Sequence, residues 1–418
     1  MPTQSAHQPS PTDPAAQTRQ SPQTSAETPG REMSPASDLQ TLKSAALPDT
    51  MLRLSRVIGN RAVGNLVQRQ DEVIDLGEMV VTGTAGPLLT PVQERQAINF
   101  YASDRRYTPE IIRQIQSAIG RPETGRMDAE DVQTVARWQD EHFSGDQSLR
   151  RDGMTGPRTL SAMFPFGLMT AESMETFSTE IEEVFSNWST YTTPAARATA
   201  IVTAVNQRLT AAGVPATTPA SAALSGSTLG EFDGTAWTIT MNQTLLTATL
   251  SDDLKRQLVN TIYHEARHAE QNFRELRQQA GMGKTAAQLQ RITGVPAAVA
   301  AAAVADPMEG GSIEAIVAQD EYESFYGNRS AQTTAVYREL TAAGTALRTA
   351  RDAHNANPTP ATQAALDRAT ARRQRAYEAY RNLPEEHDAF WTGNAMEEMY
   401  SADRAAEAEA AEAETEEE

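Results

Sequence analysis

The segment from Asp252 to Ala280 carries the start and stop signals of one long helix. Ser251 is a favourable N-cap, two aspartates follow in the first turn, where the helix dipole favours anions, and Gly281 comes directly after the segment. Apolar residues recur every four positions along its first part: Leu254, Leu258 and Ile262. The sequence therefore predicts a helix that is held rigidly against a hydrophobic core.

Two of the six histidines in the chain lie within this helix, four residues apart. Residues at that spacing share one helix face, so His264 and His268 can reach a single metal ion while Glu265 projects beside them. The chain has no cysteine, so an ion here must be held by histidine and carboxylate. We expect a Zn²⁺ site. The alternatives are a coincidental H-E-x-x-H run on a surface helix and a site that has lost its metal.

A catalytic zinc site takes three protein ligands and keeps its fourth position for water. Glu386 is the preferred third ligand. Pro384 and Glu385 precede it as in the first turn of a helix, and the small Ala389 would let that helix approach the histidines closely. Other acidic residues, on a helix expected between Gly311 and Tyr326, remain as alternatives: Glu314, Asp320, Glu321 and Glu323.

The long separation of Glu386 from His268 needs a structural explanation. Residues 333–381 are rich in alanine, arginine, glutamine and glutamate, with a break at Asn355–Pro360, and are expected to form a helical hairpin. A hairpin is compact at its base, so the chain can return to the core at Glu386. A purely structural extension is preferred here to a spacer or a substrate-facing arm.

The run His264–Gln271, together with Leu383–Ala389, resembles zincin-type metallopeptidases whose third zinc ligand is a glutamate. The resemblance implies that His264, His268 and Glu386 bind zinc and that Glu265 is the general base that activates water.

The expected helix over 193–212 and the alternating strand Trp237–Met241 precede the metal helix in the order of the zincin core. In that family the strand binds extended substrate through backbone hydrogen bonds. The resemblance therefore implies a protein or peptide substrate. The donor to the oxyanion stays open among Tyr322, Tyr326 and His387.

The first 88 residues suggest how such an enzyme is carried. Residues 1–47 are rich in proline, serine, threonine and glutamine and are expected to be a disordered arm, without an apolar signal-peptide region. Within residues 48–88, Leu52–Arg69 is basic and amphipathic. It resembles a short segment near the N-terminus of proteins encoded with extracellular contractile injection systems. The resemblance implies a cargo made in the bacterial cytoplasm and delivered outside, or into a target cell, by an injection particle.

Residues 89–166 are expected to form a small three-helix domain. A helical stripe runs from Ile111 to Ile119, a second helix starts near Val132, and turns lie at Thr124–Asp128 and Asp152–Pro157. With Trp138-Gln139 and the Asp-Gly-x-x-Gly-Pro turn, this unit resembles the peptidoglycan-binding-like domain. That resemblance implies peptidoglycan as a partner, although a spacer or docking role is preferred.

The expected fold class is therefore mainly α (α+β). A zincin-like domain should cover residues 167–404, with the hairpin as an insertion, and an acidic disordered tail should cover 405–418. The net charge of −19 argues against a nucleic-acid partner, and no apolar run is long enough to span a membrane.

Three functions remain open. The first is a zinc endopeptidase delivered as a toxin or effector. The second is an endopeptidase that cuts the peptides of peptidoglycan in the cell wall. The third is a non-enzymatic cargo or adaptor with a vestigial metal site.

Overall fold

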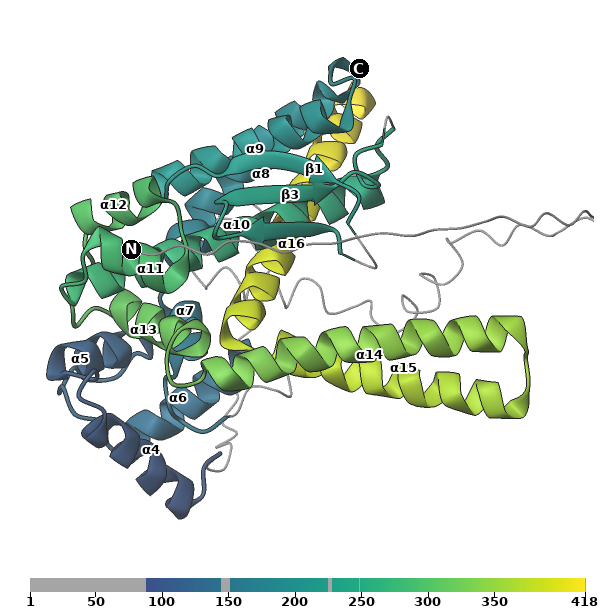
Figure 1. Ribbon diagram of the computed structural model, residues 1–418. Helices are drawn as coiled ribbons and strands as arrows, with labels where there is room; N and C mark the ends of the chain where they lie inside the picture. The colour runs from purple at the N-terminus through teal and green to yellow at the C-terminus, as the bar shows by residue number, and fades with distance from the viewer. Residues whose placement is uncertain (1–87, 144–150, 225–227, 248, 418) are drawn as a thin grey trace, which may run out of the picture. The chain divides into compact units, whose positions relative to one another are not determined.

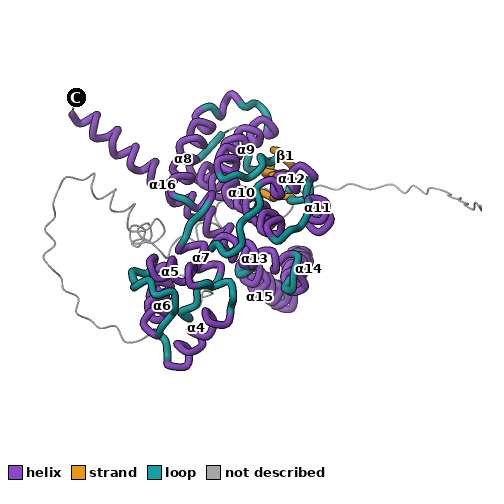
Figure 2. The backbone as a smooth tube through the Cα atoms, turned by 90° about the vertical axis from the view of Figure 1, so that its left-hand side faces the viewer, coloured by secondary structure: helices purple, strands orange, loops and turns teal. Residues whose placement is uncertain are grey.

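The chain is mainly helical in the part that the structure describes. The computed structural model describes residues 88–143, 151–224, 228–247 and 249–417. These residues form thirteen α-helices and one small sheet (Figures 1 and 2), which confirms the expected helical class. None of the described helices combines the length and the hydropathy needed to cross a lipid bilayer. The expected arm at 1–47 and the Leu52–Arg69 motif lie outside the described residues.

Four helices, rather than the three expected, lie between residues 89 and 166, because the short stretch after the Asp152–Pro157 turn is itself helical. They are α4 (Pro91–Ser103), α5 (Pro109–Ala118), α6 (Ala129–His142) and α7 (Pro157–Met163). Their apolar faces share one core cluster with Ile313, Ile316 and Val317 of a later helix, α13 (Ile313–Phe325). This unit therefore completes its core with residues from beyond position 167.

The predicted helix at 252–280 is confirmed as α10 (Asp252–Gly281), and Ser251 caps it by accepting a hydrogen bond from the amide of Leu254. Most of α10 is buried, because helices and a strand pack around it. The helices that precede and follow it are α8 (Ala171–Ser186), α9 (Pro194–Ala211), α11 (Ala286–Thr293), α12 (Ala297–Ala305) and α13 (Ile313–Phe325), with short 3₁₀ turns η1 (Gly167–Met169) and η2 (Trp188–Thr190).

The sheet has three strands, in the order β1-β3-β2. They are β1 (Thr218–Ala222), β2 (Gly230–Asp233) and β3 (Thr238–Asn242); β1 is parallel and β2 antiparallel to β3. The expected strand is β3, but it begins one residue late because Trp237 takes a left-handed conformation, with φ 54°, at the end of the preceding turn.

The position of β3 corrects one expectation. We expected this strand to bind substrate through its backbone, but β3 is the central strand and pairs with a neighbour on each side. The edge strand that packs against α10 is β2. Its four residues, Gly-Glu-Phe-Asp, alternate in burial, but the strand is too short for sequence analysis to have detected it.

The predicted hairpin is confirmed. Helices α14 (Ser330–Ala356) and α15 (Pro360–Arg381) lie side by side and are joined by a turn at Asn357–Thr359 (Figure 1). The chain then enters α16 (Pro384–Glu417), which packs against α10. Residues 405–417 belong to α16, so the expectation of a disordered tail is wrong for them. Alternating alanine and glutamate favours helix, and this propensity outweighs the repulsion between the charges.

Candidate metal centre

Small residues on α16 allow this helix to pack closely against α10. A Cβ atom added at Gly393 would lie 2.9 Å from the carbonyl oxygen of Asn260 and 3.2 Å from the Cβ of His264. Ala389, one turn before Gly393, is fully buried. This close crossing brings the first turn of α16, which contains Glu386, to the face of α10 that carries the two histidines.

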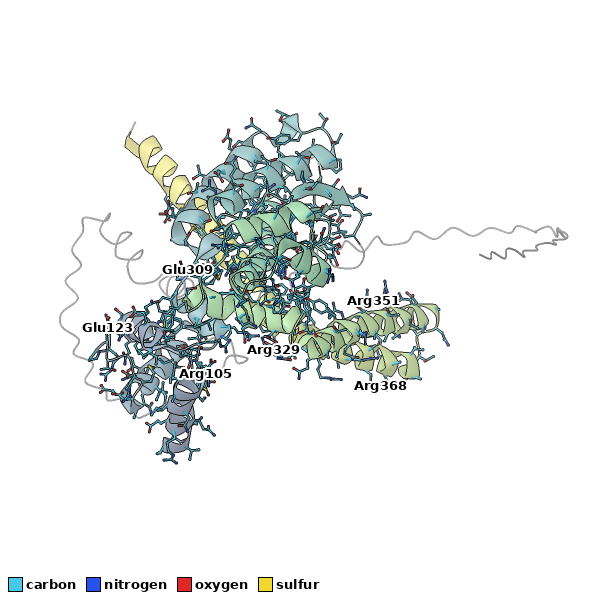
Figure 3. The ribbon with its side chains drawn as sticks, turned by 60° about the vertical axis from the view of Figure 1, so that its left-hand side comes forward. Arg105, Glu123, Glu309, Arg329, Arg351 and Arg368 are labelled. Atoms are coloured by element: carbon cyan, nitrogen blue, oxygen red, sulfur yellow. The ribbon has the colours of Figure 1, made fainter. Side chains whose placement is uncertain are left out.

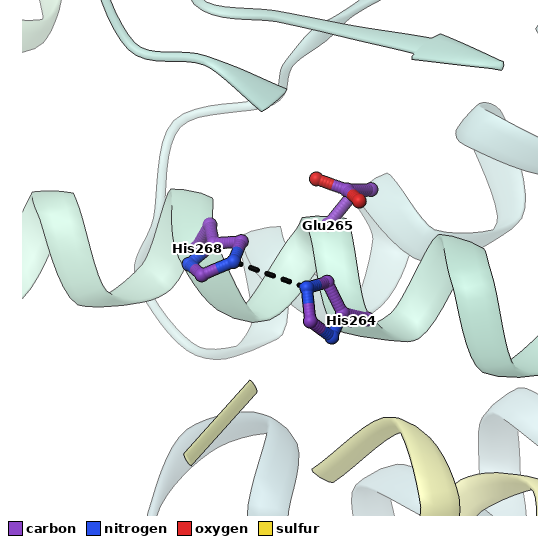
Figure 4. A group of neighbouring side chains, drawn as sticks. All are labelled: His264, Glu265 and His268. Carbon is purple, nitrogen blue, oxygen red and sulfur yellow. Dashed lines mark hydrogen bonds between the residues drawn. The ribbon is translucent and has the colours of Figure 1, made fainter. Parts of the chain in front are cut away.

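The two histidines and Glu386 lie together, as the sequence predicted. The Nε2 atoms of His264 and His268 are 3.2 Å apart (Figure 4), and Oε2 of Glu386 lies 3.8 Å from the first and 3.6 Å from the second. Two nitrogens bound to one tetrahedral zinc ion at 2.0–2.1 Å are about 3.3 Å apart. The spacing of these side chains therefore fits a zinc ion.

An unsatisfied buried oxygen supports the same reading. Glu386 is only 4% exposed, and its Oε2 atom has no hydrogen-bond partner. A buried carboxylate oxygen without a partner is costly, and a cation between the three side chains would remove that cost. The ligand atoms of His264, Glu265 and His268 also lie within 4.8 Å of one another. The donor set thus fits a divalent metal ion.

Hydrogen bonds orient both imidazoles. His264 donates to the backbone carbonyl of Ala389, and Nδ1 of His268 lies 2.9 Å from the side-chain oxygen of Gln271. The amide nitrogen of Gln271 in turn donates to Asp388, at 2.7 Å. With their other nitrogens held in this way, both rings direct Nε2 toward Glu386, and such partners fix the tautomer that binds metal.

The charges of these groups are strongly coupled. Burial lowers the pKa of His264 to about 3, which keeps this ring neutral. Burial alone would lower the pKa of His268, but the facing Glu386 carboxylate outweighs it and raises the pKa to about 9. Burial alone would raise the pKa of Glu386, yet the charge of His268 lowers it to about 2. Without an ion, His268 and Glu386 therefore form an ion pair at neutral pH.

We therefore expect zinc affinity to depend on pH. At neutral pH the ion must displace the proton of His268, so the apparent affinity should fall about tenfold for each pH unit below the His268 pKa of about 9. The measurement is competition with a chromophoric chelator, in Glu265→Gln so that this neighbouring carboxyl does not titrate. An affinity that stays constant over this pH range would contradict the displacement of a proton from His268 by the ion.

Glu265 lies between the two histidines and strand β2. The register of β2 turns the amide of Phe232 away from β3, and this amide donates to Oε2 of Glu265, at 2.9 Å. A Cβ atom added at Gly230 would lie 2.7 Å from Thr261 and 3.0 Å from the Cγ atom of Glu265, so only glycine lets the strand pass this close. Burial raises the pKa of Glu265 to about 7, which suits a general base at neutral pH.

Two tyrosines of the hairpin reach Glu386, and sequence analysis missed both. The Tyr337 hydroxyl donates to Oε1 of Glu386, at 2.7 Å, and the Tyr380 hydroxyl also hydrogen-bonds this carboxylate. The hairpin is therefore part of the centre, not the purely structural extension that we preferred. Tyr337 and Tyr380 lie on amphipathic helices, and the sequence does not show which part of the chain these helices contact.

Two of the expected oxyanion donors, Tyr322 and Tyr326, lie in another part of the structure. Tyr322 and Tyr326 pack against each other, with ring centroids 5.6 Å apart, and both lie close to Glu275. His387 follows Glu386 on α16. Tyr337 and Tyr380 are the tyrosines that hydrogen-bond a ligand of the centre.

The four alternative third ligands have other partners. Both oxygens of Glu321 accept from Arg274, Asp320 pairs with Arg329 at 2.8 Å, and Glu314 lies 3.7 Å from Arg277. Glu323 accepts from Gln319 and from the amide of Asn328. Among the described carboxylates on these positions and on α16, Glu386 is the one that the structure brings to both histidines.

A buried ion network lies beneath the histidines. Arg267, between His264 and His268 in sequence, is 0% exposed; it pairs with Asp388 at 2.7 Å and with Glu270 at 2.8 Å. Arg274 bridges Glu270 and Glu321. Burial opposes the charge of Arg267, but its two carboxylate partners raise its pKa. The network joins α10 to α13 and α16, and so holds Gln271 and the histidines in place.

The centre thus combines three side chains suited to a divalent ion, a carboxylate base with a near-neutral pKa, and two tyrosine hydroxyls. Such a set can support the attack of water on a polarised carbonyl. In comparisons with protein-family models, curated proteins and solved structures, nothing matches this chain.

Proposed function

We propose that this protein is a zinc-dependent endopeptidase of the zincin type, with a catalytic domain over residues 167–404 that carries the hairpin as an insertion. The observation that carries the proposal is the Oε2 atom of Glu386, a buried oxygen without a hydrogen bond that faces two imidazole nitrogens. A zinc ion would satisfy all three atoms. The alternative of a vestigial site is disfavoured because the base Glu265 and its partner Phe232 are both in place.

The side chains of the centre have distinct roles in this proposal. A bound zinc ion would polarise the peptide carbonyl and lower the pKa of a water molecule. Glu265 accepts the proton of the attacking water at Oε1, because Oε2 is held by the amide of Phe232. Tyr337 and Tyr380 both hydrogen-bond Glu386, and we propose that one of these hydroxyls turns from Glu386 to donate to the developing oxyanion.

The edge of β2 that faces away from β3 is the proposed place for the substrate backbone. The backbone groups of Gly230 and Phe232 point to this edge. The Phe232 amide already donates to Glu265, which leaves the Phe232 carbonyl for a peptide. An extended peptide could add to this edge through main-chain hydrogen bonds, with its scissile bond beside Glu265. The substrate in this proposal is therefore a protein or peptide in an extended conformation.

We further propose that the enzyme is a toxin or effector carried by a contractile injection particle, made in the bacterial cytoplasm and released outside or into a target cell. This part of the proposal rests on the resemblance of Leu52–Arg69 to segments of such cargo proteins.

Peptidoglycan peptides are the second candidate substrate. A hollow of about 460 Å³ lies on α5 and α6, lined by charged residues and one aromatic ring, among them Arg121, Arg137, Trp138 and Glu141. Aromatic and charged side chains around an open hollow suit a polar polymer. This is the observation that favours a cell-wall substrate.

The two substrates can be separated directly. We expect the zinc-loaded protein to cleave proteins in a cytosolic extract of candidate target cells and to release no peptides from purified sacculi, with the chelator-treated protein inactive on both. Mass spectrometry of new peptide termini is the measurement. Release of wall peptides alone would favour the cell-wall enzyme. Identical products with and without chelator would contradict a zinc peptidase.

A further inference from the structure

The hairpin differs in charge from the rest of the chain. Between Ser330 and Arg381 the sequence has eight arginines, no lysine and four acidic residues, in a chain whose net charge is −19. Among the described ion pairs, one involves these arginines: Arg372 pairs with Glu339 at 2.7 Å. The hairpin is therefore a basic element that reaches the proposed active centre of an acidic protein.

Arg381, at the end of α15, lies close to the metal ligands. Its guanidinium sits over the ring of Phe390, 4.8 Å from the ring centroid, and the same ring packs against His264 at 4.5 Å. The side chain is exposed, and the described residues give it no acidic partner. The Phe390 ring thus lies between the guanidinium of Arg381 and the imidazole of His264.

Arg373 continues this surface along α15. It lies over Tyr377, 5.3 Å from the ring centroid, and no described carboxylate pairs with it. Tyr377 packs against Phe390 at 6.4 Å, and Tyr380 against Phe390 at 6.2 Å. Positions 373, 377 and 381 are four apart and therefore share one helix face, and position 380 lies at its edge, three residues after 377. We call Arg373, Tyr377, Phe390 and Arg381 the hairpin surface.

We propose that the hairpin surface binds an acidic segment of the polypeptide substrate, next to the bond that is cleaved. The inference rests on the proposed peptidase function and names its substrate class. Guanidinium groups bind carboxylates in a planar, bidentate manner, and both arginines are already oriented by stacking on aromatic rings. The rings between them offer an apolar strip for the substrate backbone and its aliphatic side chains.

Peptide is favoured over nucleic acid as the occupant. Arginine with aromatic rings can also bind single strands, but such binding needs a groove of positive charge that follows many phosphates. Here two unpaired arginines lie on a face adjoining a strongly acidic body, which would repel a polyanion. A short acidic stretch in a peptide needs only two contacts.

The test uses the zinc-loaded full chain carrying Glu265→Gln, so that binding is measured without cleavage. Fluorescence anisotropy follows a labelled peptide of alternating glutamate and alanine, a matched peptide with glutamine in place of glutamate, and a labelled oligothymidylate. We expect the glutamate peptide to bind more tightly than the other two probes. Adding Arg373→Gln and Arg381→Gln should weaken its binding about tenfold, equivalent to about 1.4 kcal/mol.

The matched control adds Arg351→Gln and Arg368→Gln. These exposed arginines lie further along the same hairpin (Figure 3), so the pair removes the same charge away from the centre. Binding weakened equally by both pairs of substitutions would overturn the proposal, since it would reflect general attraction to the hairpin. Tighter binding of the oligothymidylate would overturn it in favour of nucleic acid.

Hydrolysis by the protein with Glu265 intact separates the two proposals. Binding that depends on Arg373 and Arg381, without hydrolysis of any bound peptide, supports the surface and contradicts the peptidase function. Hydrolysis of the glutamine peptide as fast as the glutamate peptide supports the peptidase function and contradicts the surface.

Discussion

Glu265→Gln is expected to lower kcat/KM for peptide hydrolysis by about three orders of magnitude, as found when a general base is removed from an enzyme. Glutamine keeps the size of the side chain, and its carbonyl oxygen can still accept from the amide of Phe232. What it loses is the ability to take a proton from water. The measurement is the rate of cleavage of a protein that the wild type cuts.

The control for this variant is its metal content. Glu265 is not among the three proposed ligands, so zinc should bind Glu265→Gln as tightly as the wild type, whereas Glu386→Ala should lose it. Full activity in Glu265→Gln would show that another group activates water. Loss of zinc from Glu265→Gln would place this side chain among the ligands instead.

Arg267→Met should destabilise the folded protein by about 3–5 kcal/mol, because it leaves buried carboxylates without their cation. Asp388 would keep only its hydrogen bond from Gln271, and Glu270 would keep Arg274 and the amide of Leu168. Methionine fills much of the same volume, so the loss comes from charge, not from a cavity. The free energy of unfolding in urea is the measurement.

A second variant isolates the charge effect. Replacing Arg267 by Met and Asp388 by Leu together removes both members of the pair, so much of the lost stability should return. The surface control is Arg372→Met, whose partner Glu339 is exposed, and it should leave the free energy of unfolding nearly unchanged. A similar loss in Arg372→Met and Arg267→Met would contradict the assigned role of the buried network.

Local signals in the sequence were sufficient to predict much of the helical framework. The capping of α10 by Ser251, the break between α14 and α15, and the start of α16 at Pro384 all depend on residues close in sequence. The placement of Glu386 beside the histidines followed from a similar signal, the small residue one turn further along α16. Each of these features is set by propensity and periodicity.

The features that could not be predicted depend on packing between distant segments. Strand β2 is a strand only because β3 pairs with it and Glu265 accepts from its edge. Tyr337 and Tyr380 reach Glu386 because the hairpin folds back at its base. Arg267 occupies a variable position of the H-E-x-x-H pattern and looks like an ordinary surface residue in the sequence. Its complete burial becomes evident only with Asp388 and Glu270 around it.

The hairpin also determines when the centre can assemble. Its two helices contact mainly each other, and such short-range contacts form early in folding. The histidines of α10 precede it in the chain and Glu386 follows it, so the third ligand arrives only when the segment after α15 has docked. The proposed ion site is therefore complete only late in folding. If the protein is the proposed peptidase, a freshly synthesised molecule would be inactive toward neighbouring proteins until α16 has packed against α10.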